Sequence, residues 1–233
     1  MKNLTFPTIT LAATLIIAAL IVSNAAGKFS SQNRYVSVKG LSQKEVEADK
    51  VIWPILYKEA GNSLNEISIS LAKKEQIIKK FLIENGIKEE EISNSAPEII
   101  DYKTERYAPE RNENRYNVTN VITVVTSQVE LTRELLTRTN DLLAQGVVLS
   151  SGDYRYNISY EYTALNDIKV EMIKEASANA KASALQFAND SNSKLGKIKN
   201  ATQGQISISD LNPNMPYIKR IRVVTSISYF LND

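Results

Sequence analysis

Tyrosine recurs at every second position in one short segment of the chain. The row consists of Tyr154, Tyr156, Tyr160 and Tyr162, with an isoleucine between the two pairs and polar residues at the intervening positions. In a strand, alternate side chains share one face. On an exposed face such a row could stack on sugars or other flat ligands, and on a core face its hydroxyls would reach the rim. The core interpretation is favoured, because the alanine-rich segment that follows needs a sheet to pack against.

Three carboxylates also alternate along one segment, at Glu45, Glu47 and Asp49. On one face of a strand they could form half of an oxygen-ligand cation site, or contribute to a carboxylate pair for acid–base catalysis. A catalytic pair needs a second acid across a cleft, and the sequence identifies none. A solvated strand face that discourages edge-to-edge pairing is the favoured interpretation.

The composition excludes much other chemistry. The chain has 233 residues, no histidine and no cysteine, so Ser-His-Asp triads, cysteine nucleophiles, disulfides and the usual zinc or copper sites cannot be built. The eight glycines are scattered singly and form no phosphate-binding loop. We therefore expect no enzyme activity, no catalytic residues, no cofactor and no metal. A formal charge of +2 also argues against nucleic acid as a partner.

Residues 1–27 form a separate segment, which is either a cleaved secretory signal or an uncleaved membrane anchor. Lys2 is the only charged residue before Lys28, and an apolar run from Leu11 to Val22 lies between them. A basic start, an apolar run and then small residues are typical of a secretory signal. Counted over residues 8–26, the apolar stretch is also about long enough to span a bilayer. Both alternatives predict an extracytoplasmic protein of the cell envelope, anchored in the inner membrane or periplasmic.

Hydrophobic periodicity predicts helices and strands in the remaining chain. Ser63 and Glu66 match a capping box, and Gly86 is a stop signal for the helix between them. A later helix carries a stripe of Ile173, Ala176, Ala180, Ala184 and Phe187. The predicted helices cover residues 64–85, 129–145 and 166–190. The predicted strands cover residues 34–40, 45–57, 99–105, 116–127, 154–162, 196–208 and 217–230. Pro54 suggests that its strand bends or lies at an edge.

This order of elements predicts an α+β protein. We expect two α/β-sandwich subdomains, at residues 34–150 and 151–233, whose mostly antiparallel sheets pack against the long helices. This prediction includes an exchange of strands between the first subdomain and the second as an option. The tetrapeptide VVTS occurs at 124–127 and again at 223–226, which agrees with two related halves.

The body of the chain, from Tyr35 to Leu231, resembles the SIMPL-domain family of bacterial envelope proteins. The resemblance rests on VSVKG and EVEAD near the start, on ENGIKEEEIS at the exit of the first helix, on ASANAKASALQFANDSNSKLGKIKNA, and on the closing RVVTSISYFL. Residues 47–49 depart from the usual pattern, which has a Pro-Asp segment there, and Trp53-Pro54 suggests a subgroup. The resemblance implies an exported or membrane-anchored protein with two α+β subdomains, with relatives that form rings or act in stress tolerance. It implies no catalytic residues.

Two functions follow from these observations. The first is a non-enzymatic envelope protein that acts through oligomerisation or partner binding, in envelope or stress maintenance. In this case we expect a homo-oligomer, with membrane contact through residues 8–26 if they are retained. The alternative is an extracytoplasmic ligand-binding module that uses a tyrosine-lined sheet face.

Overall fold

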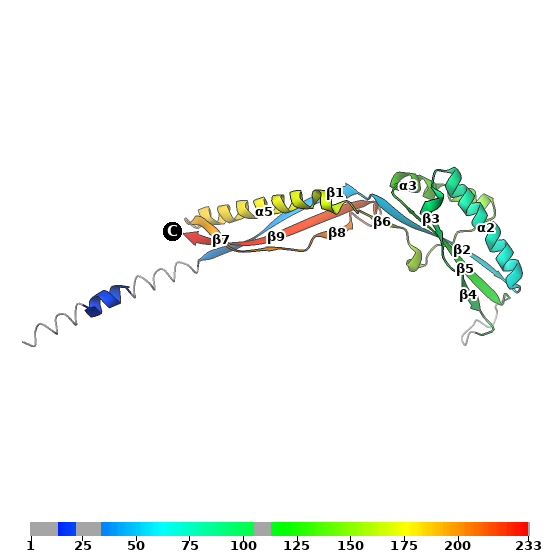
Figure 1. Ribbon diagram of the computed structural model, residues 1–233, viewed down its shortest axis with the longest axis horizontal. Helices are drawn as coiled ribbons and strands as arrows, with labels where there is room; N and C mark the ends of the chain where they lie inside the picture. Colours follow the sequence, from blue (N-terminus) through cyan, green and yellow to red (C-terminus); the bar gives the residue numbers. More distant parts are fainter. Residues whose placement is uncertain (1–13, 22–33, 105–112, 233) are drawn as a thin grey trace, which may run out of the picture. The chain divides into compact units, whose positions relative to one another are not determined.

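The computed structural model describes residues 14–21, 34–104 and 113–232 (Figure 1). The described residues divide into two compact units, each drawn from separate parts of the chain. Of the described residues, unit 1 comprises those within 1–44, 166–208 and 221–233, and unit 2 comprises those within 45–165 and 209–220. The predicted border between residues 150 and 151 therefore does not separate the units. Residues 35–44, in the first half of the chain, lie with the second half, because their strand pairs with the C-terminal strand.

Unit 1 consists of a long helix over a sheet. Its elements are β1 (Tyr35–Glu47), α5 (Leu165–Asp190), β7 (Lys194–Gln203), β8 (Ser207–Asp210) and β9 (Ile218–Asn232). The strand order is β1-β9-β7, and β8 pairs with β9 as well. Figure 1 shows α5 lying along β1 and β9. Burial alternates along β9, so that every second side chain faces the helix and the others lie on the outer face.

The helix lies so close to β1 that only small residues fit between them. A Cβ atom on Gly40 would lie 1.8 Å from the carbonyl oxygen of Ala176 and 2.5 Å from the amide nitrogen of Ala180. The buried residues of α5 follow each other every four positions: Met172, Ala176, Ala180, Ala184 and Ala188. The stripe predicted from the sequence was therefore correct at its alanines and wrong at Phe187, which is 58% exposed.

Unit 2 contains larger core side chains. Its strands are β2 (Lys50–Gly61), β3 (Ile92–Asn94), β4 (Glu98–Asp101), β5 (Tyr116–Thr126) and β6 (Ser159–Glu161). Its helices are α2 (Leu64–Glu84), α3 (Val129–Thr137), α4 (Asn140–Ala144) and the short 3-10 turns η1 (Glu89–Glu91) and η2 (Tyr154–Tyr156). The strand order is β3-β5-β2-β6, with β4 also on β5, and these pairings are antiparallel. The largest hydrophobic cluster joins α2 to β2 and β5.

Local signals placed the ends of α2 correctly. The Ser63 side chain accepts a hydrogen bond from the backbone N–H of Glu66, as a capping residue does. Gly86 follows the helix with φ +99°, a conformation that glycine adopts at low cost. Pro54 lies on β2 just beyond residues 50–52, where the pairing with β6 ends. Its missing N–H is therefore tolerated, as the edge prediction required.

Four predicted elements differ from the structure. The strand predicted at 45–57 covers the end of β1 and most of β2, with a break at residues 48–49. The strand predicted at 196–208 covers most of β7 and the start of β8. The strand at 154–162 is reduced to β6, because Asp153 accepts a hydrogen bond from the N–H of Arg155 and begins a 3-10 turn at Tyr154–Tyr156. The helix at 129–145 is divided into α3 and α4. At the division the hydroxyls of Thr137 and Thr139 donate to the carbonyls of Glu134 and Leu136, and such local bonds compete with a continuous helix.

The prediction of an α+β protein with antiparallel sheets is confirmed. The predicted leader lies largely outside the described residues. Of it, residues 14–21 are helical, and their large apolar side chains are exposed. No helix within the described residues is both long enough and apolar enough to cross a membrane.

The contact at Gly40 gives a stability prediction. We expect Gly40→Ala to destabilise unit 1 by at least about 3 kcal/mol, because the new methyl group would overlap backbone atoms that cannot move aside. Gly61→Ala is the matched control, since the nearest atoms to its new Cβ are those of Ile67 at 3.4 and 3.5 Å. Urea denaturation followed by circular dichroism measures both changes. Trp53, buried in unit 2, reports that unit separately by fluorescence. An unchanged unfolding curve for Gly40→Ala would contradict the close contact.

Candidate functional site

The four candidate tyrosines do not form a row. Tyr154 and Tyr156 belong to the turn η2, and Tyr154 is 84% exposed. Tyr160 lies on β6 and is buried, whereas Tyr162 follows the strand and is half-buried. Because the turn interrupts the alternation, the rings share no common sheet face. Neither the favoured core face nor the alternative stacking surface therefore exists as one row of four tyrosines.

Tyr160 instead belongs to a small cluster in unit 2. Its ring meets that of Tyr217 edge to face, with the ring centroids 6.2 Å apart. The guanidinium of Arg133 lies 3.7 Å from the centroid of the Tyr217 ring. Burial raises the pKa of Tyr160, while the charge of Arg133 lowers it less. The core interpretation therefore holds for this one tyrosine, packed with Ala48 and Val51.

The three carboxylates at 45–49 are not arranged as a cation site either. Glu45 lies 3.5 Å from the guanidinium of Arg220, and Glu47 is exposed. Asp49 lies beyond the end of β1, where its carboxylate accepts hydrogen bonds from the backbone N–H groups of Thr163 (2.8 and 2.9 Å) and Ala164 (2.9 Å). These N–H groups immediately precede α5, so Asp49 supplies the acceptor that the start of a helix needs. Among the described residues there is no cluster of three or more acidic side chains suited to a metal ion.

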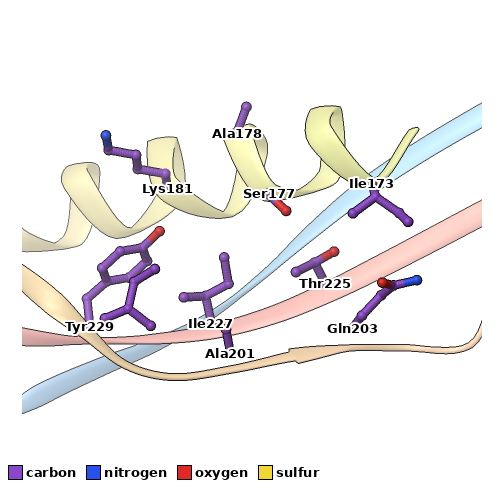
Figure 2. Close-up of a pocket in the computed structure, with 10 residues that line it drawn as sticks. Ile173, Ser177, Ala178, Lys181, Ala201, Gln203, Thr225, Ile227 and Tyr229 are labelled. Carbon is purple, nitrogen blue, oxygen red and sulfur yellow. The ribbon is translucent and has the colours of Figure 1, made fainter. Parts of the chain in front are cut away.

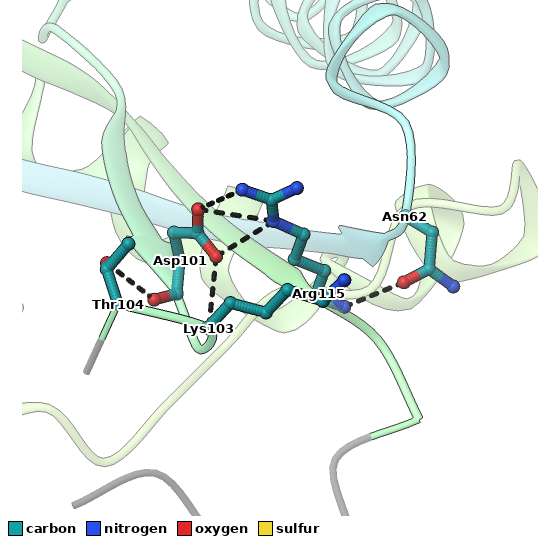
Figure 3. Close-up of polar contacts among 5 residues, drawn as sticks. All are labelled: Asn62, Asp101, Lys103, Thr104 and Arg115. Atoms are coloured by element: carbon teal, nitrogen blue, oxygen red, sulfur yellow. Dashed lines mark hydrogen bonds and ion pairs between the residues drawn. The ribbon is translucent and has the colours of Figure 1, made fainter. Parts of the chain in front are cut away.

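A polar cluster fixes the ends of the segment between β4 and β5 (Figure 3). Arg115 donates to both carboxylate oxygens of Asp101 at 2.8–3.2 Å, and its backbone N–H donates to the side chain of Asn62. The Asp101 carboxylate also accepts from the N–H of Lys103. The Arg115 hydrogen bonds lower the pKa of Asp101. Both carboxylate oxygens of Asp101 and the side-chain oxygen of Asn62 are engaged within the cluster, so we interpret it as structural.

Unit 1 contains an open groove beside α5 (Figure 2). Its volume is about 520 Å³. The floor is formed by Thr225, Ile227 and Tyr229 of β9. The flank of α5 forms one wall and β7 the other. The groove exists because α5 lies against β1 and β9, which leaves β7 beyond the helix. The wall residues are Ile173, Ser177, Ala178 and Lys181 on α5 and Ile198, Ala201 and Gln203 on β7.

The groove is suited to binding an apolar surface. Ile198 of β7 is 55% exposed and Ile173 of α5 is half-buried, and both line the groove. The hydroxyl of Thr225 is buried and makes no hydrogen bond to any described residue. Lys181 is the only lining residue with a full charge at neutral pH. The lining offers no carboxylate, and its ionisable side chains are Lys181 and Tyr229 only, so we expect binding here rather than catalysis.

Sequence reasoning missed this groove. Residues 194–203 of β7 are nearly all exposed, and their mixture of lysine, glycine and polar residues with Ile198 predicts an ordinary edge strand. The signal that was present lies on α5. Val170, Ile173, Ser177, Lys181 and Leu185 follow each other at intervals of three or four, which defines a second, partly apolar flank beside the alanine stripe.

Comparison with protein families gives one match. The model of a family described as "SIMPL: Protein of unknown function (DUF541)" matches residues 36–225, most of the chain. The description assigns no activity to the family. Comparison with curated proteins found no match to this chain.

The position of Asp49 gives a pH prediction. Burial alone would raise its pKa, but the hydrogen bonds from Thr163 and Ala164 outweigh burial and lower it. A lowered pKa means that this carboxylate stabilises the fold above its unfolded value of about 3.9, and that the contribution is lost as the pH falls through the folded value. We expect Asp49→Ala to cost about 1–2 kcal/mol at pH 7 and to be nearly neutral at low pH.

Glu47→Ala is the control, since Glu47 is exposed and should change stability by less than about 0.5 kcal/mol. Urea unfolding of both variants at several pH values makes the comparison. Equal losses for Asp49→Ala and Glu47→Ala at pH 7 would refute the capping role.

Proposed function

We propose that this chain, which belongs to the SIMPL family, is a non-enzymatic protein of the cell envelope. In this proposal its unit 1 associates with a second copy of the chain through the groove beside α5. The observation that carries the proposal is an apolar groove on a sheet that its own helix covers incompletely. A role in envelope or stress maintenance belongs to the same proposal.

Exposed apolar residues on both sides of the groove support association. Val170 and Leu185 lie on the same flank of α5 as the wall residues and are exposed, and so is Ile198 on β7. Burying such side chains against another apolar surface releases ordered water and stabilises the complex. The edge of β7 is a poorer candidate for regular strand pairing, because its register shifts between Leu195 and Ile198 and again before Asn200.

The arrangement of the groove wall favours a second copy as the occupant. In a two-fold interface residue i of one copy contacts residue j of the other, and j contacts i. Ser177 and Ala178 are small and lie at the middle of α5, with Ile173 four positions before Ser177 and Lys181 four positions after it. A two-fold axis through Ser177 would bring two helices close together and place Ile173 against the aliphatic stem of Lys181. With a net charge of only +2, repulsion between copies is small.

The envelope location rests on residues 1–27. Their basic start and apolar run support export, either as a cleaved signal or as an anchor through residues 8–26. The alternative function, a ligand-binding face of four tyrosines, is not carried forward, because Tyr154 and Tyr160 lie in a turn and a strand without a common face.

A single cysteine tests the two-fold arrangement sharply, because the natural chain has none. We expect the full chain carrying Ser177→Cys to form a disulfide-linked dimer under mild oxidation in its native envelope, since a disulfide requires Cα atoms within about 7 Å. Ala182→Cys, exposed on the opposite side of the same helix, is the control and should remain monomeric. Non-reducing electrophoresis measures both.

A second variant tests whether the Ser177→Cys dimer forms through the groove or by chance collision of two copies. We expect Ile198→Asp, which places a charge in the groove, to abolish the Ser177→Cys dimer and to lower the mass of the wild-type assembly by light scattering. Val148→Asp, an exposed apolar position in unit 2, should leave both results unchanged. A monomeric wild-type protein at high concentration, or equal crosslinking at residues 177 and 182, would overturn the proposal.

A further inference from the structure

Unit 2 contains a second concavity, between α2 and the strands β4 and β5. Its volume is about 290 Å³. It opens near Pro97, in the short interval between β3 and β4, where the strand that pairs with β5 is interrupted. The walls are mainly apolar: Leu64, Ile67, Leu71 and Ala72 on α2, and Ile99 and Val118 on the strands. This volume fits a molecule of one ring or a short alkyl chain.

A buried amide lies in the apolar lining. Asn120 on β5 is only 6% exposed, and its Nδ2 group donates to the hydroxyl of Tyr57 at 2.7 Å. Its Oδ1 atom is buried and has no partner among the described residues. Since the Tyr57 hydroxyl reaches only one of the two polar atoms, either orientation of the amide leaves the other unpaired. Buried polar groups normally have partners, so a missing partner indicates a role outside simple packing.

A carboxylate also lines this concavity. Glu75, on α2, lines the concavity, and its Oε1 atom accepts from Asn94 and lies 2.8 Å from the ammonium of Lys79. Oε2 has no hydrogen-bonding partner among the described residues. The hydrogen bond from Lys79 lowers the pKa of Glu75, so the group is ionised at neutral pH.

The carboxylate and the amide belong to one electrostatic neighbourhood. Burial raises the pKa of Tyr57 to about 12, the hydrogen bond from Asn120 opposes this rise, and the negative charge of Glu75 adds to it. The charge of Glu75 is therefore felt at the hydroxyl that Asn120 contacts. Two acceptor atoms without partners among the described residues, Asn120 Oδ1 and the charged Glu75 Oε2, thus belong to a concavity whose lining is otherwise apolar except for Ser68.

We propose that this concavity binds a small amphipathic amine, whose apolar body packs between α2 and β5 and whose ammonium group donates to Glu75 Oε2 and to the amide of Asn120. The lining contains no cationic residue. Lys79 is already paired with Glu75, so an anionic ligand would meet a carboxylate without a compensating charge. A neutral alcohol would fill the space but would forgo the charge-assisted hydrogen bond.

Three molecules of matched shape test the proposal on the full chain: 2-phenylethylamine, 2-phenylethanol and phenylacetate. We expect isothermal titration to show that the amine binds at least about ten-fold more tightly than either of the others at pH 7. Glu75→Gln should remove this preference. Glu84→Gln, which changes an exposed carboxylate near the end of the same helix, should preserve it.

A steric variant locates the site. Ile99→Arg at the exposed edge of the concavity should abolish amine binding, whereas Ile69→Arg, which is exposed on α2 outside the lining, should not. Circular dichroism confirms that each variant is folded. No amine binding at millimolar concentration, equal affinity for amine and phenylacetate, or unchanged binding in folded Ile99→Arg would each overturn the proposal. These results are independent of self-association, which is tested in unit 1.

Discussion

The backbone of β1 lies against the backbone of α5 at Gly40, where a methyl group would come within 1.8 Å of the Ala176 carbonyl oxygen. This contact determines the construction of unit 1. Because strand and helix touch without intervening side chains, the buried face of α5 consists chiefly of alanine, whose methyl groups occupy the little space left. Close packing of small residues brings many atoms into van der Waals contact, although each residue buries little apolar area. A helix held this close to β1 cannot also be centred over β7.

The groove is thus a geometric consequence of the Gly40 contact. A helix is about 10 Å wide and neighbouring strands are about 4.8 Å apart, so one helix covers about two strands. In unit 1 these two are β1 and β9, and the third strand of the order, β7, is left beside the helix. Ile198 and Ala201 are exposed for this reason, although their neighbours on β9 are buried. In unit 2 the buried face of α2 carries larger side chains, including Ile67 and Phe81, and the buried Asn120 and Tyr57 are hydrogen-bonded to each other on the sheet.

The sequence predicted the elements whose signals are local. The capping pair at Ser63 and Glu66, the stop at Gly86 and the long apolar run of β5 depend on neighbouring residues, and they placed α2 and β5 nearly correctly. The alternating tyrosines failed because Asp153 offers the backbone a competing local hydrogen bond, which an alternation pattern does not register. The Asp49 carboxylate accepts hydrogen bonds from Thr163 and Ala164, which are more than a hundred residues away in the sequence. The two concavities also depend on non-local pairings, since the groove of unit 1 needs β9 beneath α5 and the concavity of unit 2 needs β5 beneath α2.

The absence of histidine and cysteine limits the chemical groups that either proposed site can use. Without these residues, a site in this chain has to depend on shape, amide and hydroxyl groups, and fixed charges that do not titrate near neutral pH. The groove of unit 1 has one lysine and an unpaired hydroxyl, and the concavity of unit 2 has one carboxylate and an unpaired amide. Binding at such sites would therefore depend on the fit of an apolar surface and on a few fixed hydrogen-bonding groups, not on the ionisation of an imidazole or a thiol.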